Sequence, residues 1–146
     1  LFGMIVYGWL SDRYNRPMLL ASCYFMRALT FLLLIYITGN MALLYIFAIL
    51  FGVFDYATFP IVASIVATHI GRHIMGLTMG MIFALHSLGG ALGSFMGGYL
   101  YDLFVRYDWV WIVSVALALV AALLTLFIKE KREPKIATPA GEPAAA

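Results

Sequence analysis

The sequence predicts an all-α, polytopic membrane protein with four full transmembrane helices and the end of a fifth. Of its 146 residues, 64% are hydrophobic and 11% are charged, and the mean hydropathy is +0.98. Soluble domains are about 45–50% apolar and about 25% charged, and a chain of this size could not bury so much apolar surface in water. The apolar residues also form long runs that lack the polar–apolar alternation of membrane strands.

The chain opens with a short apolar segment, which four longer ones follow. Leu1–Leu10 is too short to cross a bilayer, which takes about 20 residues, so we expect it to be the end of a helix. At about 1.5 Å per residue, each longer segment can cross a bilayer with some tilt. The four spans are expected at residues 18–38, 42–68, 75–101 and 109–128.

Composition divides the chain into two parts. Residues 1–128 contain the apolar segments, whereas residues 129–146 consist of a charge run and an Ala- and Pro-rich stretch. A segment of that kind cannot bury enough apolar area to fold, so we expect a flexible tail. The absence of an initiator methionine at Leu1 also suggests that the chain is a fragment.

The positions of the basic residues predict the orientation in the membrane. Seven of them fall in 11–17, 69–74 and the tail, whereas Arg106 alone falls on the other side. Because basic loops stay in the cytoplasm, the first loop, the third loop and the C-terminal tail are expected there, in an integral multi-pass protein of the plasma (inner) membrane. Aromatic residues flank the opposite loop, as a membrane–water interface favours: Tyr99, Tyr101, Tyr107, Trp109 and Trp111.

A spaced motif precedes the first full span. It consists of Gly8, Asp12, Arg13 and Arg16 in the segment GWLSDRYNRP. The motif resembles the G-x-x-x-D-R-x-x-R signature of the major facilitator superfamily, which lies in cytoplasmic loops after the second and the eighth helix. Four spans and a polar tail follow it here, which suits the second copy. The resemblance implies the C-terminal part of a twelve-helix carrier, from the end of helix eight through helix twelve, without the N-terminal half.

The resemblance implies secondary active transport, in which two six-helix halves rock about a site near the midplane. The rhythm of glycines, Pro60 and Asp102 is similar to that of carriers for small organic anions, of the monocarboxylate and oxalate/formate type. Sugar, drug and other nutrient carriers remain alternatives, as does a non-transporting accessory four-span protein. The implied partners are the lipid bilayer, a small-molecule substrate, the missing half and, where transport is proton-coupled, H⁺.

Three ionisable residues fall near the middle of the predicted spans, namely Arg27, Asp55 and His86. Ionisable groups at that depth are costly and are usually functional or paired. Asp55 shares a helical face with Thr58, Phe59 and Val62, and Asp55 and Phe59 are candidates for substrate contact or proton coupling, with a structural carboxylate as the alternative. Arg27 could bind an anionic substrate, but a structural pair with Asp55 or with a group in the missing half is favoured.

Two further features concern helix shape and packing. Pro60 cannot donate to the carbonyl of Tyr56, which predicts a kink that is either a gating hinge or a tolerated irregularity. His86 shares a face with small residues that let another helix approach, so it lies either at a helix–helix contact or in a proton relay. These small residues are Gly89, Gly90, Gly93 and Gly97.

The sequence gives no support for catalysis, a cofactor or nucleic-acid binding. It has no phosphate-binding loop, nucleophile elbow or paired carboxylates, and its net charge of +2 is small. A single cysteine excludes an internal disulfide framework. His69 and His73 have the spacing of two zinc ligands on a helix, but no glutamate follows the first and no third ligand is evident, so no metal site is predicted.

Overall fold

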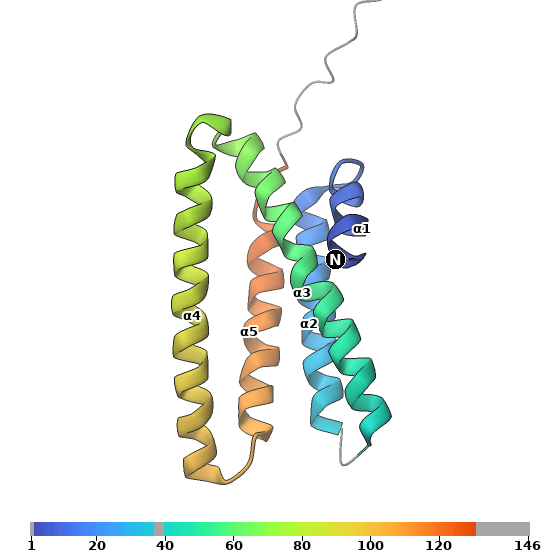
Figure 1. The fold of residues 1–146 in the computed structure, drawn as a ribbon, viewed down its shortest axis with the longest axis vertical. Coiled ribbons are helices and arrows are strands. Elements are labelled where there is room, and N and C mark those ends of the chain that lie inside the picture. The colour runs from blue at the N-terminus through green and yellow to red at the C-terminus, as the bar shows by residue number, and fades with distance from the viewer. Residues whose placement is uncertain (1, 37–39, 131–146) are drawn as a thin grey trace, which may run out of the picture.

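The structure is a computed structural model that describes residues 2–36 and 40–130. These residues form helices and short connections, and no strand is found among them. Four of the helices are long and apolar enough to cross a membrane, so the predicted fold class is confirmed (Figure 1). The elements in chain order are α1 (Phe2–Ser11), α2 (Arg16–Tyr36), α3 (Met41–His69), the 3₁₀ helix η1 (Arg72–Ile74), α4 (Met75–Phe104) and α5 (Asp108–Leu126).

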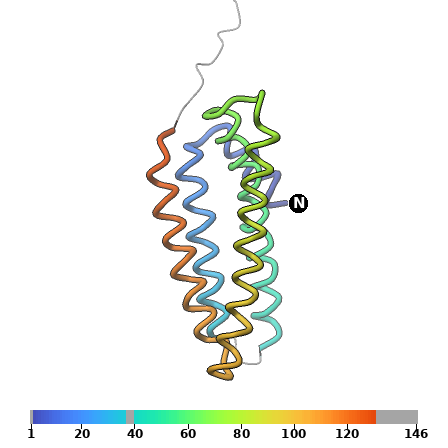
Figure 2. The backbone as a smooth tube through the Cα atoms, turned by 90° about the vertical axis from the view of Figure 1, so that its left-hand side faces the viewer, coloured from blue at the N-terminus to red at the C-terminus, as the bar shows by residue number. Residues whose placement is uncertain are grey.

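The four long helices run up and down the long axis of the bundle (Figures 1 and 2). α2 packs mainly on α5 and α3, and the short α1 packs on α3. α4 makes far fewer contacts with α3 and α5, and none of its residues is buried. The bundle therefore consists of a packed group formed by α1, α2, α3 and α5, with α4 more loosely attached at its side.

A small core joins the packed group. Leu20 and Cys23 of α2 are buried against Ala57 and Ile61 of α3. Large apolar side chains point outward over most of the remaining surface; Phe95, for example, is 70% exposed. Outward-facing apolar residues of this kind suit a hydrocarbon solvent, in which burial against protein is not needed.

The first predicted span is shifted, because α2 begins at Arg16 rather than Met18 and is described as far as Tyr36. The side chain of Asn15 accepts a hydrogen bond from the main-chain N–H of Met18 at 3.0 Å, which caps the helix. Pro17 is tolerated in the first turn because the N–H groups there have no intrahelical partner. Arg16 and Pro17, which were expected in the first loop, are therefore the first two residues of α2.

The boundaries of α3, α4 and α5 also differ from those of the predicted spans, each for a local reason. α3 begins at Met41 because Asn40 caps it, accepting from the N–H of Ala42 at 3.0 Å. α4 continues past Tyr101 to Phe104, because it ends only where Val105 adopts a left-handed conformation. α5 begins at Asp108, whose carboxylate suits the positive end of the helix dipole, and it ends at Leu126 rather than residue 128.

Two predictions fall wholly or partly outside the described residues. The connection expected between the first two predicted spans, residues 39–41, is described only from Asn40 onward, and the tail expected at 129–146 only at Lys129 and Glu130. The kink predicted at Pro60 does not interrupt α3, which is one helix from Met41 to His69.

Candidate functional site

The central feature of the bundle is an ion pair between α2 and α3. Arg27 lies near the middle of α2 and Asp55 at the middle of α3, and one terminal nitrogen of the guanidinium contacts the Asp55 carboxylate. The same nitrogen donates to the main-chain carbonyl of Asp55 at 3.4 Å. The two side chains are 17% and 33% exposed. The structure therefore contains the pairing that the sequence analysis favoured for Arg27.

Aromatic rings surround the guanidinium. Its carbon lies 5.5 Å from the ring centre of Tyr24 and 5.8 Å from that of Phe51. Rings at these distances stabilise a cation through their negative faces. Nε of Arg27 is buried and has no hydrogen-bond partner among the described residues. Arg27 thus uses one terminal nitrogen for Asp55 and keeps a buried donor unpaired.

The ion pair lines a cavity of about 90 Å³ between α2, α3 and α4. All four residues that the sequence analysis singled out for substrate or proton contact line it, namely Arg27, Asp55, Phe59 and His86. His86 comes from α4, which runs antiparallel to α3, and this reversal brings it to the level of Asp55 (Figure 1). Three helices therefore bring Arg27, Asp55 and His86 together at one small cavity.

Other lining residues complete the cavity. Thr58 and Val62 belong to the face of Asp55 that the sequence pattern had identified. The hydroxyl of Thr58 donates to the main-chain carbonyl of Asp55 at 2.7 Å. Tyr24 and three lining residues of α4 were not predicted from the sequence. Tyr24 lies one turn from Arg27, and the α4 residues lie one or two turns from His86. The missed α4 residues are Met79, Ile82 and Phe83.

A second, more open cavity of about 420 Å³ adjoins the same arginine. Arg27 and Tyr24 line both cavities. The second cavity is bounded by Phe31 and Phe51 and by residues of α4 and α5, including Ser114. Its walls are mainly apolar, so within it Arg27 is the charged group.

The glycine row on α4 borders this open side. A Cβ atom added at Gly89, Gly90 or Gly93 would meet nothing within 4 Å, whereas one at Gly97 would meet Val110 of α5 at 3.7 Å. Close packing is therefore present at Gly97, and the described residues place no helix against the other three. His86, on the same side of α4, is exposed at the cavity.

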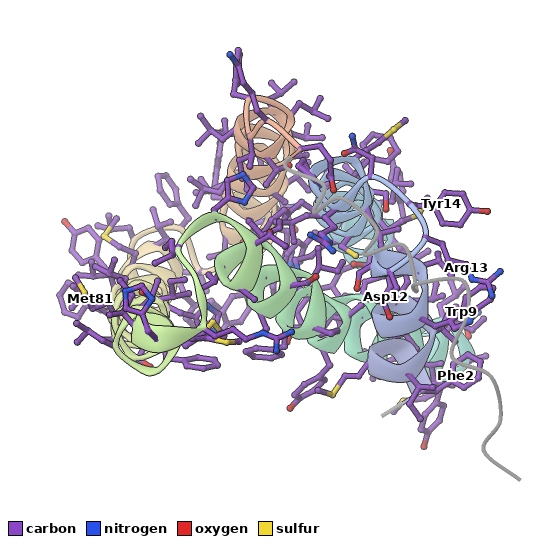
Figure 3. All side chains as sticks on the ribbon, turned by 90° about the horizontal axis from the view of Figure 1, so that it is seen from above. Phe2, Trp9, Asp12, Arg13, Tyr14 and Met81 are labelled. Carbon is purple, nitrogen blue, oxygen red and sulfur yellow. The ribbon has the colours of Figure 1, made fainter. Side chains whose placement is uncertain are left out.

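The signature motif is divided between two surfaces. Gly8 lies against α3, where its added Cβ would meet Pro60 at 3.7 Å. Nε of Arg16 donates to the main-chain carbonyl of Ser11 at 3.2 Å and so closes the turn between α1 and α2. Arg13 instead points away from the bundle, and its guanidinium carbon lies 4.2 Å from the ring centre of Trp9 (Figure 3). Asp12 is exposed.

Other described residues have no direct role at the cavity. His69 and His73, with the spacing of zinc ligands, belong to no group of metal-binding side chains among the described residues. The aromatic residues at the α4–α5 connection pack together, with the Tyr101 and Tyr107 rings 4.4 Å apart. Beside them Arg106 forms an exposed ion pair with Asp108.

Comparison with known proteins supplies the relatives of the chain. Residues 1–146 match the family profile of the Major Facilitator Superfamily. The chain is also 31% identical over 139 residues to YcxA of Bacillus subtilis (strain 168), an uncharacterized MFS-type transporter. The match covers 90% of this chain and 34% of that relative, so the chain spans about a third of the relative's length. No solved structure matches the chain.

Proposed function

Since the chain belongs to the major facilitator superfamily, we propose that it forms part of a secondary active carrier that moves a small solute across the membrane by alternating access. The observation that carries this proposal is the meeting of Arg27, Asp55 and His86 at one cavity. Each lies well inside a helix of membrane-spanning length. Carriers hold substrate and coupling ions near the midplane, where an ionisable side chain is otherwise too costly to keep.

We propose a small organic anion as the solute. Arg27 is the cation at both cavities, and its buried Nε lacks a partner among the described residues. A guanidinium recognises carboxylates through paired donors, and the surrounding aromatic and aliphatic walls suit a small apolar body. These contacts favour an anion over a sugar, because a sugar site needs several hydrogen-bonding side chains.

We propose that transport is coupled to a proton through this ion pair. While Asp55 is ionised it neutralises Arg27, and an anionic solute must compete with it. A proton on Asp55 removes that competitor and leaves Arg27 free for the solute. The solute and the proton would then bind together and leave together. On this proposal His86 exchanges the proton with Asp55, and the cavity that both residues line supports that role.

The test is uptake by the full-length carrier in liposomes, with labelled lactate and labelled oxalate as probes and labelled glucose as the comparison. An inward proton gradient should drive uptake of at least one anion, and Asp55→Asn should abolish that response while solute exchange continues. Asp108→Asn is the matched control, because Asp108 is also paired with an arginine but lies exposed at a helix end. Uptake of glucose alone would overturn the anion proposal, and an unchanged gradient response in Asp55→Asn would overturn the coupling proposal.

We also propose that the α1–α2 turn, η1 and the segment after α5 face the cytoplasm, in a plasma (inner) membrane. Two hydrogen bonds support a shared side: the N–H of Arg16 donates to Glu130, and His69 bonds to Lys129. The basic residues of these segments therefore lie at one end of the bundle, as the positive-inside rule requires. On this proposal the rest of the protein supplies the other helices of a twelve-helix carrier, including those that close the cavities.

A further inference from the structure

His69 closes α3 with an unusual pair of contacts. Its Nδ1 lies 3.1 Å from the main-chain oxygen of Ile65, and its Nε2 lies 2.9 Å from the main-chain oxygen of Lys129. Carbonyl oxygens only accept hydrogen bonds, and a neutral imidazole has only one N–H to donate. Both contacts are therefore hydrogen bonds only when His69 is the doubly protonated imidazolium.

The hydroxyl of Thr68 is consistent with a doubly protonated His69. Thr68 Oγ1 lies 3.4 Å from Nδ1 of His69, and it also lies 3.0 Å from the carbonyl oxygens of Ser64 and Ile65. Its single proton is used for one of those carbonyls, so towards His69 it can only accept. A cation at the C-terminal end of α3 is also favoured by the helix dipole.

The next residue of the same segment is held at a different helix end. The carboxylate of Glu130 accepts from the main-chain N–H of Arg16, the first residue of α2, at 2.8 Å. A carboxylate there satisfies a donor without an intrahelical partner and suits the positive end of the dipole. Lys129 and Glu130 thus connect the end of α5 to the end of α3 and to the start of α2.

We propose that Lys129 forms a pH-dependent clasp, which holds the end of α3 to the segment after α5 when His69 is protonated and releases it when it is not, while Glu130 keeps its bond to Arg16. Loss of the second proton leaves a ring lone pair facing a carbonyl oxygen, so one of the two bonds must break. The bond to Lys129 is the one expected to break, because it joins two elements at an exposed site. The bond to Ile65 lies within one helix and should persist. The clasp should therefore be closed at low pH and open as the pH rises through the range in which histidine loses its charge.

The charged and titratable side chains of the surrounding elements are Asp12 and Arg13 in the α1–α2 turn, Arg16 in α2, Arg72 and His73 in η1, and Lys129 and Glu130 after α5.

The clasp would regulate any rearrangement in which these helix ends separate. It is independent of the proposed transport function, because it rests on contacts at the helix ends and not on the cavity. A failure of the clasp would leave the roles of Arg27 and Asp55 untouched, and a failure of the transport proposal would leave the clasp standing.

The test measures distances in the full-length protein by pulsed EPR. Spin labels replace Ile74, which is 41% exposed in η1 just after α3, and Phe127, which is 82% exposed at the end of α5. A Cys23→Ala background removes the native thiol. The parent should give a narrow distance distribution at about pH 5.5 and a broad one at about pH 8.5. His69→Ala should be broad at both, and His73→Ala, which removes the adjacent histidine, should behave like the parent.

Two results would overturn the clasp. The first is a parent distribution with the same width at both pH values, a measurement that needs no substitution at His69. The second is a narrow distribution in His69→Ala at about pH 5.5.

Discussion

Arg27 on α2 contacts both the carboxylate and the main-chain carbonyl of Asp55 on α3, so that one guanidinium nitrogen joins the middles of two helices. The contact fixes the height of α2 relative to α3 and places the pair at the wall of a cavity. Two charges at this depth are stable only together, because either one alone would be left desolvated without a counter-charge.

Removing one partner of the Arg27–Asp55 pair should therefore destabilise the protein more than removing one partner of an exposed ion pair. We expect Arg27→Gln to lower the free energy of unfolding by about 2–4 kcal/mol, somewhat below the cost for a fully buried pair because Asp55 keeps some exposure. Arg106→Gln breaks the exposed pair with Asp108 and should cost less than about 1 kcal/mol. Denaturant unfolding of the purified protein compares them, and equal losses would mean that the central pair is not desolvated.

The contact between α1 and α3 depends on a glycine. A Cβ added at Gly3 would overlap the carbonyl oxygen of Val53 and lie 3.1 Å from its Cα, and backbone cannot move aside cheaply. Gly3→Ala should cost about 1–3 kcal/mol by overpacking. Gly52→Ala is the control on α3, because its Cβ would meet nothing within 4 Å and should stabilise the helix by about 0.5–1 kcal/mol. Thermal unfolding distinguishes the two, and a neutral Gly3→Ala would contradict the close approach.

The end of α4 contains a strained residue. Val105 has φ 54° and ψ 25°, a left-handed conformation that a β-branched side chain rarely adopts. Glycine adopts it without penalty, so Val105→Gly should raise stability by about 1 kcal/mol. Val120→Gly, in the middle of α5, should instead lower it by about 1 kcal/mol. Loss of stability in Val105→Gly would show that α4 does not end with a left-handed Val105.

The proposed orientation can be tested by labelling single cysteines from either side. Tyr14 and Tyr107 are 62% and 50% exposed at opposite ends of the bundle, and Cys23 is fully buried, so its background labelling should be low. In right-side-out vesicles an impermeant maleimide should label Tyr107→Cys, and it should reach Tyr14→Cys only after the membrane is opened. The reverse pattern would contradict a cytoplasmic α1–α2 turn.

The sequence was most informative about features that depend on local pattern. Apolar runs gave the four spans, and helical spacing put Thr58, Phe59 and Val62 on the face of Asp55. The antiparallel order of α3 and α4 then explains why His86 reaches the same cavity. Helix ends were less accurate because they depend on single caps, such as the Asn15 side chain and the left-handed Val105.

Contacts between distant segments had no local signature. The bond from Arg16 to Glu130 joins residues 114 positions apart, and a charge run after the last span is predicted as solvated tail by composition alone. The open space beside Gly89, Gly90 and Gly93 was equally hidden, because a small-residue row predicts close packing without naming the helix that packs.

The central claim is that the Arg27–Asp55 pair couples a proton to solute movement and is more than a structural tie. The double variant Arg27→Gln/Asp55→Asn tests it most directly, because removing both charges relieves the uncompensated charge of each single variant. We predict that its unfolding free energy returns towards that of the parent while proton-driven uptake of labelled lactate or oxalate remains absent. A double variant that is stable and still accumulates either anion in response to a proton gradient would show that the pair only holds α2 and α3 together.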